Sequence, residues 1–332
     1  MGKTDMDHAS TPTATRSATS PDTGSVEGIL RTQLAKGDRA LSGVAPVLSH
    51  MLASSGHALV NEDVVARLRG MLSDCARQLI DAAQTDAALV RPDQSQVDSL
   101  ADHFAENGPI LSHLYTLAME GHLASRLEQQ SSLDPMLSPL LQELIASDQN
   151  ELADLAMVTL AAQSRFIQAQ RRMVFPITEL PARLFHAILE SWQDWTRNSG
   201  KADGMSEQAA AVTLRSSYDE ASTRLALLTR LTGAMRNGAI VGLELEHAGL
   251  SLFATCLATL TRQPRDLAIL ACHDRQAARL ALGLRASGLD QTTIERQFLL
   301  LVPGERLPRD LDHIDPAKAA NLLSQSAAWK GR

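Results

Sequence analysis

Residues that could do chemistry are present in this sequence, but none has the spacing that its chemistry needs. Residues 2–4 read Gly-Lys-Thr, as at the end of a phosphate-binding loop, yet no strand and no upstream glycine precede them. Glu246 and His247 are not followed by the second histidine that a helical zinc site requires. No Gly-x-Ser-x-Gly motif offers a nucleophile. The sequence therefore indicates no catalytic, cofactor-binding or metal-binding residue.

Arginine is the side chain here that could bind phosphate groups. It makes up 26 of the 31 basic residues. A continuous basic surface would bind nucleic acid by releasing counterions from the phosphates. The net charge of −7 and the lack of a recognition-helix signature argue against such a surface. We therefore do not expect nucleic acid as the partner. The arginines that cluster are Arg165, Arg171 and Arg172; Arg224, Arg230 and Arg236; and Arg275, Arg279 and Arg285.

The elements that must position these residues are helices. Only 3% of the residues are aromatic, so Leu and Ala must fill the core of a chain that is 44% hydrophobic. Leu and Ala are strong helix formers, whereas the residues that favour strands are scarce. The sequence predicts an all-α fold of stacked antiparallel helix pairs, either a short HEAT-like solenoid or an irregular helical bundle.

Composition also predicts how the chain is divided. Residues 1–24 are rich in Ser, Thr, Asp and Pro, which predicts a disordered tail. A helical N-terminal region at 25–198 and a helical C-terminal region at 205–302 flank the most flexible interior composition. Residues 303–332 form a predicted, partly ordered C-terminal extension.

The apolar segments of the chain are short. The longest uncharged one, at 248–261, is shorter than the ~20 residues that span a bilayer, and the first residues lack the apolar core of a signal peptide. We expect no membrane span and a cytoplasmic location. Cys75, Cys256 and Cys272 lack metal-ligand spacing and have apolar neighbours, which predicts reduced, inert core residues.

The segment AAQSRFIQAQRRM, residues 161–173, places two glutamines where a core helix normally carries leucines. In a helix over 149–174, Gln163 and Gln170 fall in the centre of the apolar stripe, while Arg165 and Arg172 lie on the solvated side. A buried amide without partners costs about 1–3 kcal/mol, so each glutamine must find hydrogen bonds. Two interpretations stay open. The glutamines fix the register of the helix, or they line a groove that accepts a partner's backbone.

Capping residues predict where several helices begin and end. Asp148 and Glu151 resemble a capping box at the start of the glutamine helix, and Thr178 can cap the next one. Further along, Gly288 can adopt the left-handed conformation that ends a helix, and Asp290 can cap the following helix. These signals predict helices joined by very short turns.

Two of the three tryptophans lie on one side of the helix that follows Thr178. Aromatic residues at helical spacing usually belong to a core, but an exposed pair would make a groove for a partner. The hairpin at 149–198 is therefore the predicted partner-binding surface. Its candidate contact residues are Gln163, Arg165, Gln170, Arg172, Trp192 and Trp195.

Residues 155–189 and 247–301 carry helix patterns that resemble the bacterial proteins grouped as domain-of-unknown-function family 2336. The resemblance covers roughly residues 120–302. It implies an α-helical repeat fold, and it brings no activity and no catalytic residues to this chain.

The sequence thus predicts a non-catalytic, helical-repeat-like module for protein–protein interaction or regulatory scaffolding. Its protein partner is not identified by any motif, and the sequence leaves open whether the chain forms a homo-oligomer. Two alternatives come from other classes of protein. One is a helical-repeat protein that binds nucleic acid, and the other is an enzyme whose site no sequence pattern reveals.

Overall fold

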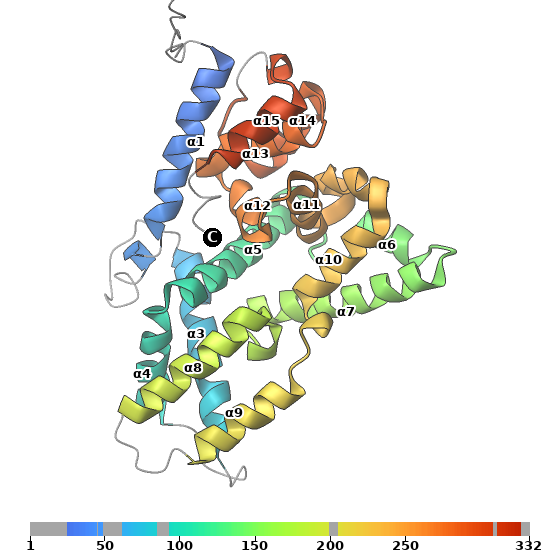
Figure 1. Cartoon of the computed structure of the whole chain (residues 1–332). Helices are drawn as coiled ribbons and strands as arrows, with labels where there is room; N and C mark the ends of the chain where they lie inside the picture. The colour runs from blue at the N-terminus through green and yellow to red at the C-terminus, as the bar shows by residue number, and fades with distance from the viewer. Residues whose placement is uncertain are drawn as a thin grey trace, which may run out of the picture.

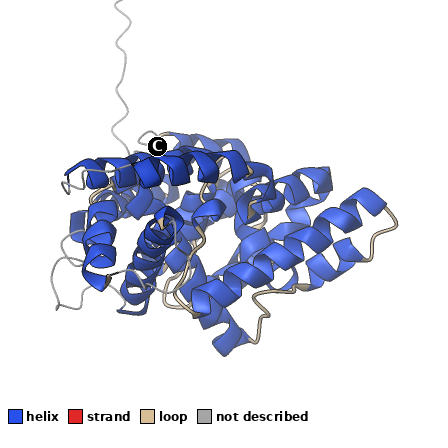
Figure 2. Ribbon diagram, turned by 90° about the horizontal axis from the view of Figure 1, so that it is seen from below, coloured by secondary structure: helices blue, strands red, loops and turns tan. Residues whose placement is uncertain are grey.

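A computed structural model describes residues 25–44, 46–48, 62–84, 93–198, 205–307 and 311–326. The elements in these ranges are helices, and Figure 2 shows them joined by short loops with no strand in the part of the chain that is described. The all-α prediction is confirmed. The predicted tail at 1–24 lies outside the described residues.

The helices of the first half of the chain are α1 (Val26–Ser42), α3 (Glu62–Ala83), α4 (Gln94–Ala105), α5 (Gly108–Ser131), α6 (Pro139–Ile145), α7 (Asn150–Arg171), η1 (Ile177–Glu179) and α8 (Ala182–Asn198). Those of the second half are α9 (Met205–Ser217), η2 (Glu220–Ser222), α10 (Arg224–Met235), η3 (Arg236–Leu243), α11 (Leu245–Thr261), α12 (Arg265–Ala271), η4 (Asp274–Gln276), α13 (Ala277–Ala286), α14 (Gln291–Leu301), η5 (Leu311–His313) and α15 (Pro316–Ser324). The elements labelled η are short 3₁₀ helices.

Helix α5 lies at the centre of the fold. Figure 1 shows it running through the middle of the molecule, with α1 and α13 to α15 on one side and α3, α4, α8 and α9 on the other. It packs against α3, α4, α7 and α8 as well as α11, α12 and α14. A helix with apolar residues on all sides belongs in a core. Its buried apolar residues include Ile110, Leu111, Leu114, Leu117, Ala118, Met119, Leu123 and Leu127.

The two ends of the described chain lie side by side. Helix α1 packs against α13 and η4, and α15 packs against α13 as well (Figure 1). One apolar core cluster contains residues from both sides of the composition break at 197–205, such as Leu114 and Leu257. In the described residues, the predicted N-terminal and C-terminal regions therefore share a core.

The turn between α13 and α14 forms as the sequence predicts. Gly288 has a φ of 93°, and Leu289 donates its backbone N–H to the carbonyl of Leu284 at 3.2 Å. The carboxylate of Asp290 accepts the backbone N–H of Thr293 at 2.8 Å. This prediction is confirmed because each of these interactions is local along the chain.

The predicted caps of α7 and α8 are wrong. At the start of α7 the capping position is Gln149, which makes no side-chain capping bond, so Asp148 and Glu151 do not form a capping box. The first amide of α8, at Ala182, is capped by Glu220 Oε1 at 2.9 Å and not by Thr178. A carboxylate from a distant segment satisfies this N–H, and no local pattern could reveal it.

Helices α7 and α8 do not form the predicted packed hairpin. Helix α7 packs mainly against α6 and α10, whereas α8 packs mainly against α4 and α9. The chain turns at Met173, which has a φ of 56°. Helix α3 then holds the connection, because Asp74 accepts the N–H of Phe175 at 3.0 Å and Gln78 donates to its carbonyl at 2.9 Å. The two helices are thereby directed to different neighbours.

The three cysteines are buried among apolar residues, which confirms their predicted place in the core. Burial raises the pKa of the Cys256 thiol to about 11 and that of Cys272 to about 12. Within the described ranges, no helix combines the length and apolar character needed to cross a bilayer.

Candidate functional site

A buried carboxylate lies at the centre of the fold, on α5. Glu120 is 0% exposed and accepts hydrogen bonds from two guanidiniums. Arg224 of α10 donates from Nη1 and Nη2 to the two carboxylate oxygens, both at 2.9 Å. Arg265 of α12 donates in the same bidentate manner, at 2.9 and 2.7 Å. We call these three residues the central ion cluster.

A kink in α11 completes this cluster. Gly249 has a φ of 69°, and a Cβ there would lie 3.2 Å from the Cβ of Ser138. Glycine fits such a position because it has no side chain to clash. Just after the kink, Ser251 donates its hydroxyl to Glu120 Oε1 at 2.8 Å. Helices α5, α10, α11 and α12 are thus joined at one carboxylate.

The charge of Glu120 is strongly stabilised in the folded chain. Burial by itself raises the pKa of the carboxyl, because loss of water penalises the ionised form. The charges and hydrogen bonds of Arg224 and Arg265 outweigh burial and hold the pKa of Glu120 well below its ordinary value of 4.5. Glu120 is therefore a carboxylate over the whole physiological pH range.

This low pKa predicts a loss of stability in acid. Above pH 4.5, Glu120 is ionised in both states and its contribution is fully present. As the pH falls below that value, the unfolded chain takes up a proton that the folded chain does not, so the free energy of unfolding falls. Urea unfolding at several pH values between about 3 and 7 measures this in the native chain and in Glu120→Gln. The difference between the two should shrink only in acid; a difference that is constant over the range contradicts the assignment.

Arg224 links the central ion cluster to α7. Its guanidinium carbon lies 3.5 Å from the centre of the Phe166 ring, a cation–π contact. Its Nη1 also donates to Gln163 Oε1 at 3.1 Å. Gln163 is 4% exposed and donates its own amide to the carbonyl of Pro135 at 2.8 Å. Gln163 therefore ties α7 both to α10 and to the loop before α6.

Gln170 is buried as well, in a different environment. It is 2% exposed, and its amide donates to Met71 Sδ at 3.2 Å. Its Oε1 has no hydrogen-bond partner among the described residues and lies 2.7 Å from where a Cβ on Gly121 would be. Both glutamines thus contact other segments of this chain.

The two glutamines should differ in what they contribute to stability. Replacing Gln163 with leucine leaves Arg224 and the Pro135 carbonyl short of a partner, so we expect a loss of about 1–3 kcal/mol in the free energy of unfolding. Replacing Gln170 with leucine should cost clearly less, since the bond it removes is a weak one to sulfur. Urea unfolding of both variants tests this order, and an equal or reversed order would show that Gln163 is not part of the buried network.

The predicted arginines lie on the exposed side of α7. Arg165 and Arg172 are both exposed, as the helical wheel predicts. Arg171, on a flank, pairs with Glu128 at 2.9 Å. Arg165 also lines a pocket, which is described below.

The tryptophans are not part of the same surface. Trp192 is 1% exposed and belongs to the core beside α4 and α5. Trp195 is partly buried, and its indole N–H donates to Ser99 at 3.1 Å. The structure therefore does not bring the tryptophans together with Arg165 or the glutamines, because α8 packs away from α7.

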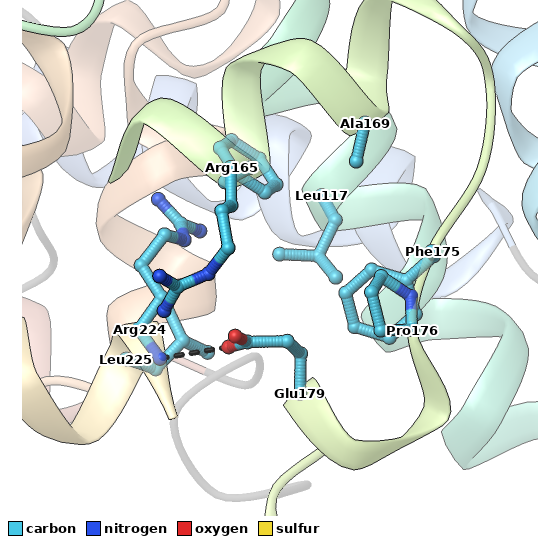
Figure 3. A pocket seen from close by; sticks show the side chains of 9 residues that line it. Leu117, Arg165, Ala169, Phe175, Pro176, Glu179, Arg224 and Leu225 are labelled. Atoms are coloured by element: carbon cyan, nitrogen blue, oxygen red, sulfur yellow. Dashed lines mark hydrogen bonds between the residues drawn. The ribbon is translucent and has the colours of Figure 1, made fainter. Parts of the chain in front are cut away.

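A pocket opens on the surface where α5, α7, η1 and α10 meet (Figure 3), and we call it the α7 pocket. Its cavity volume is about 50 Å³, and the cavity opens to solvent. That volume is well below the roughly 300–1,000 Å³ of small-molecule sites, so the pocket has room for a single small group. Its walls are mainly apolar, and three charged residues, Arg165, Glu179 and Arg224, also line it. The lining residues are Leu117, Arg165, Phe166, Ala169, Phe175, Pro176, Glu179, Arg224 and Leu225.

Three of the nine arginines in the clusters noted in the sequence make contacts inside the fold, and the other six are exposed. Arg224 is in the central ion cluster, and Arg279 is buried in an ion pair with Asp38. The Arg279 guanidinium also donates to the hydroxyl of Ser326 at 2.8 Å. Arg285 donates to backbone carbonyls, among them that of Ile314 at 2.6 Å.

Histidines of the described residues pair with carboxylates instead of gathering around a metal position. His122 Nδ1 lies 2.9 Å from Asp63, and His247 Nε2 lies 3.3 Å from Glu143. In the part of the chain that the structure describes, no three His, Cys, Asp or Glu side chains are arranged to hold a metal ion.

Sequence reasoning missed Glu120 and Arg265. A signal for Glu120 was present, since it directly follows the apolar residues Leu117, Ala118 and Met119 in the middle of α5. A charge at such a position must be paired. No comparable signal marks Arg265, because its exposure depends on the packing of α12 against α5.

Comparisons of the chain with protein-family models, with curated proteins and with solved structures found no match. The resemblance to domain-of-unknown-function family 2336 stays a prediction from the sequence. The α7 pocket and the central ion cluster are therefore the features of this chain that bear on its function.

Proposed function

We propose that this chain is a non-catalytic interaction module that binds a protein partner at the α7 pocket. The observation that supports this most is the pocket itself, a small, mainly apolar depression of about 50 Å³ that is open to solvent. Small apolar pockets on a helical surface are where the anchor side chains of protein partners bind. Arg165, one of the predicted contact residues, lies at its rim.

Rigid support of the pocket also favours this function. Binding sites work best on elements whose geometry is fixed by the residues behind them. The central ion cluster joins α5 to α10, and Gln163 joins α10 to α7. On the other side, Tyr218 donates its hydroxyl to the Leu180 carbonyl at 2.7 Å and so holds the chain next to η1. The walls of the pocket are therefore positioned before any partner arrives.

The experiment is to fill the pocket and measure what the chain captures. Ala169→Phe places a ring in the pocket, whereas Ala161→Phe adds the same ring on an exposed position of the same helix. Each tagged full-length variant is used to capture proteins from an extract of the native cells, with quantitative mass spectrometry. Melting curves establish that each variant is folded.

Proteins that bind at the α7 pocket should be lost with Ala169→Phe and retained with Ala161→Phe. We expect at least about a tenfold loss, because a blocked anchor pocket removes a dominant part of the binding energy. If the folded Ala169→Phe variant captures every partner of the native chain in undiminished amount, the proposed function at this pocket is wrong.

A further inference from the structure

The charges around the α7 pocket are not balanced. Arg224 and Arg265 carry two positive charges, which Glu120 and Glu179 match with two negative ones. Arg165 is left over. Its side chain lines the pocket and makes no ion pair or hydrogen bond with the residues that the structure describes.

Glu179 is engaged with α10 and is not a ready partner for Arg165. Its Oε2 accepts the backbone N–H of Arg224 at 2.7 Å, drawn as the dashed line in Figure 3. Arg224 begins α10, and the positive end of a helix dipole stabilises a carboxylate there. The charge of Glu179 also stabilises the ionised form of the Arg224 side chain. The carboxylate of Glu179 is thus already used by the chain itself.

The pocket has an apolar part and a charged edge. In Figure 3, Leu117, Ala169, Phe175 and Pro176 lie to one side, and the side chain of Arg165 reaches over the other side. An occupant that fits both parts carries an apolar group and an anionic group a short distance apart. A single arginine matches one carboxylate through its paired N–H donors. A phosphate group, with nearly two negative charges, would need further cations.

We infer that the α7 pocket recognises an acidic peptide segment of the partner: an aliphatic or aromatic side chain enters the apolar part, and a neighbouring Asp or Glu pairs with Arg165. This inference rests on the proposed function and specifies the chemistry of its partner. The charge complementarity to Arg165 is what selects an acidic segment over a neutral one.

The test is a selection from a phage-displayed library of random peptides on the full-length chain. Enriched peptides are synthesised, and their dissociation constants are measured by fluorescence anisotropy. We expect the enriched peptides to share a Leu, Ile, Met, Phe or Trp close to an Asp or Glu. Replacing that acidic residue with its amide should weaken binding about fivefold, as expected for a partly exposed ion pair.

Four variants of the chain assign the binding site. Arg165→Glu should weaken binding of these peptides about tenfold or more, because it replaces an attraction by a repulsion. Arg172→Glu makes the same change in net charge at the exposed residue that follows α7, which does not line the pocket, and should leave binding within about twofold. Glu179→Gln keeps an acceptor for the Arg224 N–H and removes a negative charge at the pocket that repels an acidic peptide, so it should strengthen binding. Ala169→Phe should abolish it.

The outcomes separate the inference from the proposed function. If binding is lost with Ala169→Phe but is indifferent to Arg165→Glu and to the acidic residue of the peptide, the pocket binds partners and the acidic preference is wrong. If Arg165→Glu and Arg172→Glu weaken binding equally, the effect is one of net charge and the inference is also wrong. If no enriched peptide depends on Ala169, both the inference and the binding role of the pocket fail.

Discussion

Replacing Glu120 with glutamine is expected to lower the free energy of unfolding by about 3–5 kcal/mol, because it removes the carboxylate that the guanidiniums of Arg224 and Arg265 both bind. Arg224 is 2% exposed and has Glu120 as its bidentate partner, so water cannot easily take over. A loss of this size is a large part of the stability of an ordinary domain. Urea unfolding followed by circular dichroism measures it.

An exposed ion pair supplies the control. Glu128→Gln removes the partner of Arg171 on the surface, where both side chains are more than two-fifths exposed, and should cost at most about 1 kcal/mol. If Glu120→Gln costs no more than Glu128→Gln, then the central ion cluster does not hold α5, α10 and α12 together.

A triple replacement measures what the whole cluster contributes to the free energy of unfolding. Changing Glu120, Arg224 and Arg265 together to apolar residues of similar size removes all three charges of the central ion cluster at once. We expect the triple variant to be more stable than Glu120→Gln, because no unpaired charge is left behind. A triple variant that is less stable than the single one would show that the hydrogen bonds of the cluster, and not only its charge balance, maintain the fold.

Gly70→Ala is expected to destabilise the chain by about 1–3 kcal/mol, although alanine is the better helix former. A Cβ at Gly70 would lie 2.5 Å from the backbone oxygen of Met173 and 2.6 Å from its Cβ. Backbone atoms cannot move aside as a flexible side chain can. The segment after Met173 leads to Phe175 and Pro176, which form one wall of the α7 pocket. We therefore expect this variant to weaken partner binding as well.

Gly233→Ala is the matched control for this substitution. Gly233 lies in α10 and a Cβ there meets nothing within 4 Å, so alanine should raise the free energy of unfolding by about 0.5–1 kcal/mol. Melting curves and urea unfolding of both variants give the comparison. Equal effects of the two substitutions would mean that the close approach of α3 to Met173 does not contribute to the free energy of unfolding.

The helical class and several local features could be predicted from the sequence. Few aromatic residues and a core of Leu and Ala are properties of the composition alone, and they favour helices. The turn at Gly288 depends on neighbours in the chain, and it forms as predicted. The helical period also places Gln163 and Gln170 on the buried face of α7, and Arg165 on its exposed face.

The partner of each buried face was decided only by the tertiary structure. Glu120 is bound by Arg224 and Arg265, which lie 104 and 145 residues further along the chain. Glu220 caps α8 across 38 residues, in place of the predicted Thr178. The α7 pocket likewise requires residues of α5, α7, η1 and α10 to meet. Periodicity records which side of a helix avoids water, but burial is non-directional, so packing between distant segments determines which helix covers it.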